Sequence, residues 1–137
     1  MLIHVMKPKF IVIGLVLWLA VTALLRIVGQ RVLSNRGWLS VIVLFVISFV
    51  AMALLIRFAC MRARLAPQDW PPAAVSLLLP TLLLDPFSSA FFPVVFPNMA
   101  PENAGVFGGW MIVCCAGGLL GALIRGSRHP HASAQPS

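Results

Sequence analysis

Two charged side chains stand inside apolar stretches of this sequence, Arg26 and Asp85. Arg26 interrupts the run VTALLRIVG, and Asp85 lies in LLLDPFSSAFFP, directly before a proline. Ionised groups are costly in apolar surroundings, so they are usually paired or used to bind ions and protons. These residue types therefore predict either a buried ion pair or a site that handles a cation or a proton.

The composition of the chain places both residues in a membrane protein. Of its 137 residues, 61% are hydrophobic and 9% are charged, whereas soluble domains are about 45–50% apolar and about 25% charged. A water-soluble chain of this length could not bury so much apolar side chain. The net charge is +7, and the basic residues gather at the ends of apolar runs. This arrangement favours anionic lipid head groups at the cytoplasmic face, and not nucleic acid, as the partner.

Four apolar runs approach or exceed the length of about 20 residues that a membrane helix needs. They cover about 10–28, 38–57, 72–96 and 104–124. The predicted fold is all-α, an integral membrane four-helix bundle that forms a single domain over residues 1–126. The polar tail, 127–137, is predicted to be disordered.

The distribution of basic residues predicts the orientation of the chain. With four spans, both termini and the loop between the second and third spans lie on one side of the membrane. That side carries seven basic residues: Lys7, Lys9, Arg57, Arg62, Arg64, Arg125 and Arg128. The other side carries three: Arg26, Arg31 and Arg36. Both termini are therefore predicted to be cytoplasmic. Lys7 and Lys9 before the first apolar run also fit a cleaved signal peptide, which stays open as an alternative. The run continues past any plausible cleavage point, which favours a retained span.

Arg26 and Asp85 are predicted to pair with each other because they lie at similar depths. Arg26 is 16 residues into its span, about 24 Å from the cytoplasmic edge, and Asp85 is 13 residues in, about 20 Å. Each belongs to a set of polar or small residues at helical spacing. In the first span the set is Gly14, Trp18, Thr22, Arg26 and Gln30, and in the third it is Ser76, Thr81, Asp85, Ser88 and Ser89. Thr22 and Gln30 are expected to add hydrogen bonds to the pair, and Ser88 and Ser89 to line the same site.

Pro86 predicts that the third span is broken or kinked near Asp85. Proline removes a backbone donor and disfavours helical angles in the residue before it. Asp85 could then cap a second half-helix that begins at Pro86. In transporters such breaks mark substrate or ion sites, although a kink for shape alone is the commoner outcome.

Glycines recur on one face of the fourth span, in steps of four with one gap. They are Gly105, Gly109, Gly117 and Gly121. Small residues at this spacing allow close helix packing. The partner could be another helix of the chain or a second copy, which leaves a homodimer or a membrane partner protein open.

Other chemistry is sparse. Cys60, Cys114 and Cys115 are expected to pack as small apolar side chains and not to form disulfides. The three histidines, His4, His129 and His131, lie in the tails. No metal site, cofactor or catalytic arrangement is predicted, so the chain is not expected to be an enzyme.

The segments WLAVTALLRIVGQ, LLLD and FPNMAPENAGVFGGW resemble small four-span bacterial inner-membrane proteins grouped as a family of unknown function. The resemblance implies a four-helix membrane fold and a bacterial inner membrane, and it implies no activity. Two hypotheses follow from the residues. The first is a structural or accessory protein held by the pair of Arg26 and Asp85. The second is a small proton- or cation-coupled transporter or channel subunit that uses Asp85.

Overall fold

The structure, a computed structural model, describes residues 8–33 and 37–126. The predictions for Lys7, Arg36, Arg128, the histidines and the tail at 127–137 lie outside these residues. The described part contains helices and no strand. The long helices are α1 (Pro8–Leu33), α2 (Trp38–Arg62), α3 (Trp70–Ala90) and α5 (Ala104–Gly126). The short helix α4 (Phe92–Val95) and two 3-10 turns, η2 (Pro67–Asp69) and η3 (Pro101–Asn103), complete it.

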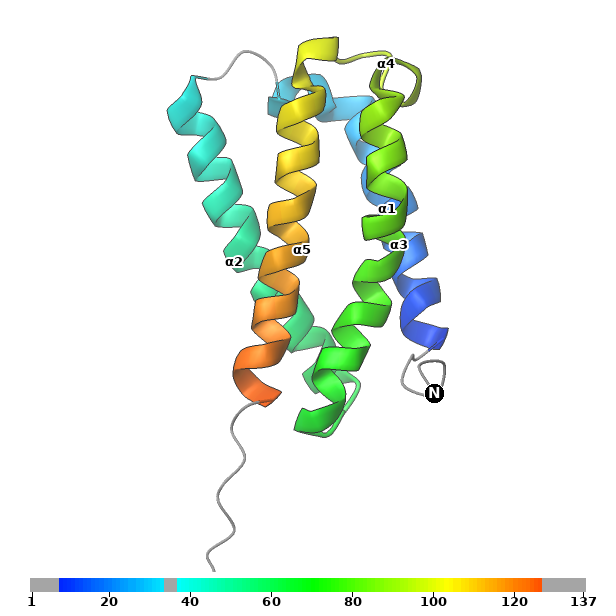
Figure 1. Cartoon of the computed structure of the whole chain (residues 1–137), viewed down its shortest axis with the longest axis vertical. Helices are drawn as coiled ribbons and strands as arrows, with labels where there is room; N and C mark the ends of the chain where they lie inside the picture. The colour runs from blue at the N-terminus through cyan, green and yellow to red at the C-terminus, as the bar shows by residue number, and fades with distance from the viewer. Residues whose placement is uncertain (1–7, 34–36, 127–137) are drawn as a thin grey trace, which may run out of the picture.

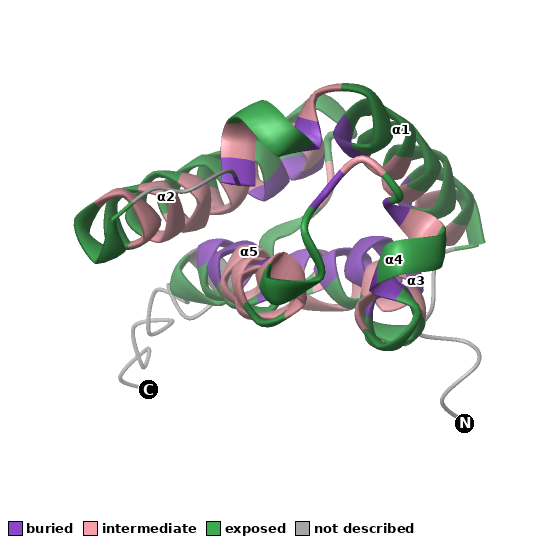
Figure 2. Cartoon of the chain, turned by 90° about the horizontal axis from the view of Figure 1, so that it is seen from above, coloured by how far each residue is buried: buried purple, intermediate pink, exposed green. Residues whose placement is uncertain are grey.

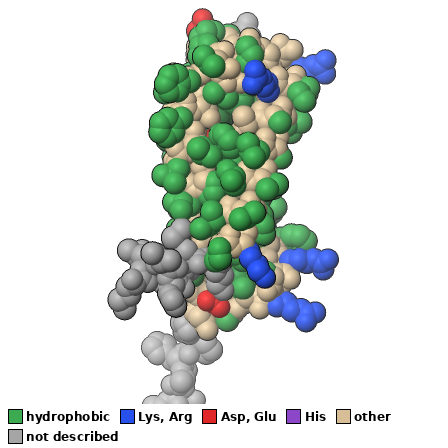
Figure 3. All heavy atoms as spheres, turned by 90° about the vertical axis from the view of Figure 1, so that its right-hand side faces the viewer, with side chains coloured by type: hydrophobic (Ala, Val, Ile, Leu, Met, Phe, Trp, Pro, Cys, Tyr) green, Lys and Arg blue, Asp and Glu red, His purple; other side chains and the backbone are tan. Residues whose placement is uncertain are grey.

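Four helical segments are long and apolar enough to cross a membrane, which confirms the predicted all-α fold with four spans. α1 begins and α5 ends at the same end of the bundle (Figure 1). On the face seen in Figure 3, hydrophobic side chains cover the middle of the molecule, and Lys and Arg side chains lie toward its two ends. This is the distribution expected of side chains that face lipid and head groups.

The four long helices do not pack in sequence order. α2 packs against α5, α5 against α3, and α3 against α1, whereas α1 and α2 scarcely touch each other. Seen from above, α1 and α2 lie on the same side of the pair formed by α3 and α5 (Figure 2). Among the described residues the bundle therefore has two outer helices, α1 and α2, and each packs mainly against one helix of the inner pair.

Glycines permit the closest helix contacts. A Cβ atom at Gly14 of α1 would collide with the carbonyl group of Leu77 in α3. Cβ atoms at Gly117 and Gly121 would likewise collide with the α2 backbone. These helix pairs therefore approach backbone to backbone, as small residues allow in membrane bundles.

The predicted glycine face of the fourth span therefore contacts α2 of the same chain. Gly109 faces the Phe45 ring, which would lie 3.3 Å from an added Cβ. Gly105 takes no part in this contact, because no atom lies within 4 Å of its would-be Cβ. Gly105 sits in the first turn of α5, beyond the level at which α2 and α5 meet closely.

α3 runs without interruption through Asp85 and Pro86, so it is one helix with two internal prolines, Pro80 and Pro86, and not two half-helices. Asp85 does not cap a new helix. Neighbouring helices and hydroxyl groups make such prolines tolerable in a membrane helix. The helix ends at Ala90, and Phe91 separates it from α4.

Asp85 lies along α3 between two apolar clusters. Toward the start of α3, Trp70, Ala73, Ala74 and Leu78 pack with residues of α2 and α5. Beyond its end, Phe92, Phe96 and Phe107 form an aromatic group with ring centroids 5.0 to 5.7 Å apart. The two clusters stabilise the bundle at both ends and leave the carboxylate at the level between them.

Candidate functional site

Asp85 is buried, with 7% of its surface exposed, and its two carboxylate oxygens differ. Oδ1 accepts a hydrogen bond of 2.8 Å from the indole Nε1 of Trp18 in α1. Oδ2 is buried and has no hydrogen-bond partner among the described residues. Burying a carboxylate oxygen without a hydrogen-bond partner costs free energy. The described part of the site therefore lacks a hydrogen-bond donor for Oδ2.

The predicted ion pair between Arg26 and Asp85 is wrong for this structure. No ion pair joins them within residues 8–33 and 37–126, and the Arg26 side chain is exposed. Arg26 lies near the end of α1, where a long basic side chain can extend toward head groups. The prediction of Thr22 and Gln30 as further partners of that pair fails with it.

The helix geometry explains why Trp18 and not Arg26 reaches Asp85. The contact of Gly14 in α1 with Leu77 in α3 marks one level of the bundle. Asp85 lies eight residues beyond this level along α3. Along α1, Trp18 lies four residues beyond it and Arg26 twelve. Both are therefore about 6 Å from the level of Asp85. Rotation decides between them: steps of four residues drift by about 40° each, so Arg26 lies about 80° around the helix from Trp18.

The carboxylate borders two cavities. The central cavity, of about 300 Å³, lies between α1 and α2 and is closed on one side by α3 and α5. Its lining is largely apolar, with few polar groups besides Asp85: Trp18, Thr22, Ser48, Thr81, Trp110 and Cys114. The lateral cavity, of about 220 Å³, lies between α3 and α5 and includes Pro86, Ser89 and Cys115. Neither lining includes a Lys, Arg or His among the residues that the structure describes.

The other predicted site residues are divided among different places. Thr22 lines the central cavity with Asp85. Ser89 lines the lateral cavity and faces Gly108 of α5. Ser88 is buried, and its hydroxyl donates to the carbonyl of Leu84 in its own helix. The two cavities that Asp85 borders therefore contain Thr22 on one side and Ser89 on the other, and neither is lined by Arg26, Gln30 or Ser88.

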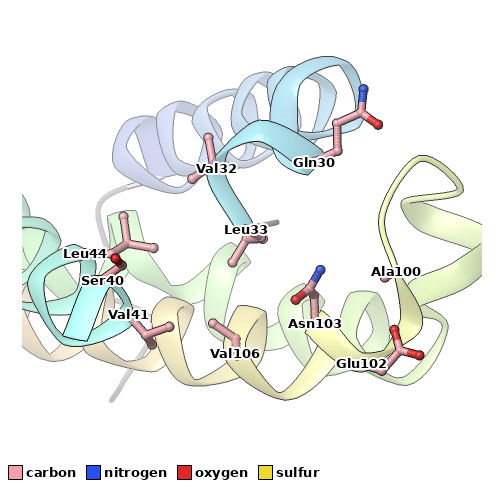
Figure 4. Close-up of a pocket in the computed structure, with 10 residues that line it drawn as sticks. All are labelled: Gln30, Val32, Leu33, Ser40, Val41, Leu44, Ala100, Glu102, Asn103 and Val106. Atoms are coloured by element: carbon pink, nitrogen blue, oxygen red, sulfur yellow. The ribbon is translucent and has the colours of Figure 1, made fainter. Parts of the chain in front are cut away.

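Gln30 lines a third cavity, the end cavity, of about 490 Å³, where α1 ends and α2 begins. Its polar lining residues are Gln30, Ser40, Glu102 and Asn103 (Figure 4). Leu44 of this cavity is one helical turn from Ser48 of the central cavity, and Val106 is one turn from Trp110. The end cavity therefore lies about one helical turn from the central cavity along α2 and α5.

Trp18 and Trp110 were not predicted as site residues, although Trp18 belongs to the set of polar or small residues at helical spacing in the first span. The indole of Trp18 donates to Asp85, and that of Trp110 donates to Ser48 Oγ at 2.7 Å. Both line the central cavity. The signal that could have found Trp18 is its spacing of four from Gly14, the residue of closest contact with α3.

The three cysteines, Cys60, Cys114 and Cys115, form no disulfide among the described residues, and Cys60 and Cys115 are buried. Among the described residues, no three His, Cys, Asp or Glu side chains are grouped so that they could hold a metal ion.

Four apolar helices around one buried carboxylate define a small membrane protein of the four-helix type. The sequence model of a family of unknown function, DUF5367, matches residues 32–129. That segment is more than half of the chain, so the protein belongs to this family. No curated protein and no solved structure matches the chain. The matched segment contains Asp85 and Trp110, whereas Trp18 and Arg26 precede it.

Proposed function

We propose that this protein is a small transporter or channel subunit in which Asp85 takes up a proton or binds a cation. One observation carries the proposal: Asp85 borders two cavities, and its buried Oδ2 has no hydrogen-bond partner among the described residues. Intramembrane carboxylates that face a cavity commonly mark ion or proton pathways. The role is binding and transfer, and not catalysis.

A structural or accessory role is the second candidate, and the hydrogen bond between Trp18 and Asp85 favours it. This bond links α1 to α3 and would stabilise the bundle. In that case Asp85 would act as an internal clamp with Trp18, and the protein would modulate a membrane partner or the envelope.

Asp85→Asn separates the two candidates, because asparagine can still accept the bond from Trp18. The full-length protein is reconstituted in liposomes that contain a pH-sensitive dye, and a pH gradient is applied. Transport predicts a proton flux that falls at least tenfold in Asp85→Asn and persists in Arg26→Gln, which removes a charge outside both cavities. Equal flux in the wild-type protein and Asp85→Asn would contradict transport and favour the clamp.

We also propose a bacterial inner membrane with both termini in the cytoplasm. Support comes from the seven basic residues on the side of the termini against three on the other. A C-terminal green fluorescent protein fusion should fluoresce, and a C-terminal alkaline phosphatase fusion should be inactive. An active phosphatase at that end would overturn this orientation.

A further inference from the structure

The charge of the cavities contrasts with the charge of the chain. The protein carries ten Lys and Arg against three Asp and Glu, a net charge of +7. Two of its three acids, Asp85 and Glu102, line the central and end cavities, which follow each other along α2 and α5. No Lys, Arg or His among the described residues lines either cavity. These cavities are therefore complementary to a cation.

The lining of the central cavity requires a ligand with an apolar body. Val21, Leu25, Met52, Leu55 and Leu77 contribute aliphatic surface, and Phe107 contributes an aromatic ring. The indole N–H groups of Trp18 and Trp110 already donate to Asp85 and Ser48, so these residues have only their rings to offer. Ring faces attract organic cations, whereas a bare metal ion would need several oxygen ligands.

The carboxylate and the volume of the cavity limit the ligand further. Asp85 Oδ2 has no donor among the described residues, so a ligand bound at this carboxylate should supply an N–H group. A volume of about 300 Å³ holds on the order of 10 water-sized groups at ~30 Å³ each. A protonated amine on a small aromatic or alkyl body satisfies both limits.

Resting on the proposed function, we infer that the cation which Asp85 binds is a small amphiphilic ammonium ion. Its N–H group donates to the carboxylate of Asp85, and its apolar body lies in the central cavity against Trp18 and Trp110. The end cavity, with Glu102 and Asn103, is its route from the aqueous phase.

The test uses the full-length protein in nanodiscs of zwitterionic lipid and measures binding by calorimetry. The probes are 2-phenylethylammonium, the neutral 2-phenylethanol and the N,N,N-trimethyl derivative, which has no N–H group. The first should bind saturably, and the other two at least tenfold more weakly. Equal binding of the neutral alcohol would overturn the inference, as would equal binding of the trimethyl derivative. Non-saturable uptake, as expected if lipid chains fill the cavity, would also overturn it.

Two variants locate the binding. Asp85→Asn should weaken binding of 2-phenylethylammonium at least tenfold. Ala51→Phe tests the same site with the carboxylate intact, because Ala51 lines the central cavity and is not buried, so a phenyl ring can enter the cavity without displacing packed neighbours. Its control is Ala23→Phe, on the exposed surface of α1 outside the cavity linings. Binding that survives Ala51→Phe unchanged would overturn the inference.

The two proposals fail in different ways. Proton flux that depends on Asp85, without binding of 2-phenylethylammonium, would overturn the ligand class and leave transport standing. Binding that depends on Asp85, without proton flux in the presence or absence of an amine gradient, would overturn transport and leave the ammonium site standing.

Discussion

Trp18 and Asp85, 67 residues apart in the sequence, are joined across α1 and α3 by a hydrogen bond of 2.8 Å. The bond satisfies one oxygen of the carboxylate, and the other has no hydrogen-bond partner among the described residues. Trp18 thus orients the Asp85 side chain, and the same bond links the outer helix α1 to α3 of the inner pair.

The strength of this bond can be measured by a double-mutant cycle of Trp18→Phe and Asp85→Leu. We expect a coupling of about 0.6–1.7 kcal/mol in the free energy of unfolding, the usual range for side-chain hydrogen bonds between membrane helices. Unfolding in mixed micelles, followed by circular dichroism, gives the four free energies. Additive effects of the two substitutions would show that the bond contributes nothing to stability.

Arg26 should be energetically independent of Asp85. Since the Arg26 side chain is exposed, Arg26→Gln should change the free energy of unfolding by less than about 0.5 kcal/mol. Its effect should add to that of Asp85→Leu within about 0.5 kcal/mol. A larger coupling, or recovery of stability in the charge swap Arg26→Asp with Asp85→Arg, would mean that the two side chains meet in the membrane.

Gly14→Ala should weaken the contact between α1 and α3. The added methyl group would collide with the carbonyl of Leu77, which belongs to a helix backbone and cannot move alone. We expect a loss of about 1–3 kcal/mol, the usual cost of overpacking, seen as a lower Tm in detergent. Ala23→Leu is the matched control, because Ala23 is exposed on the same helix. A Gly14→Ala protein as stable as the control would contradict the close approach.

Gly117→Ala should have the corresponding effect on α2 and α5, because its Cβ would collide with the carbonyl of Phe49. Gly105→Ala, in the same helix, meets nothing within 4 Å and should be neutral or slightly stabilising, since alanine favours helix. Thermal unfolding of the two variants side by side gives the difference. If Gly105→Ala proved the more damaging, the glycine face would contact a second copy and not α2.

Hydropathy and length were sufficient to predict the class of fold. A bilayer requires about 20 apolar residues in each span and internal hydrogen bonding of the backbone, which leaves four helices as the solution. The continuity of α3 was not predictable from Asp85 and Pro86, because tertiary packing decides whether a proline interrupts a membrane helix.

Only part of the candidate site could be predicted from the sequence, and the reason is geometric. Asp85 could be found because a carboxylate in an apolar run is conspicuous. Its partner could not be found from depth alone, since Trp18 and Arg26 are equally far from its level and differ in the direction in which they point. The cavities depend on which helices pack together: α2 with α5, α5 with α3, and α3 with α1. The order of the helices in the sequence does not predict this packing.

That packing order has a consequence for how the chain enters the bilayer during synthesis. α1 and α2 are synthesised first and are apolar enough to insert on their own. The main packing partner of each is a helix synthesised later, α3 for α1 and α5 for α2. α3 is the least apolar of the four spans and carries Asp85. Since α1 precedes α3 in the chain, Trp18 is already made when Asp85 emerges, and its indole can donate to the carboxylate once the two helices pack together.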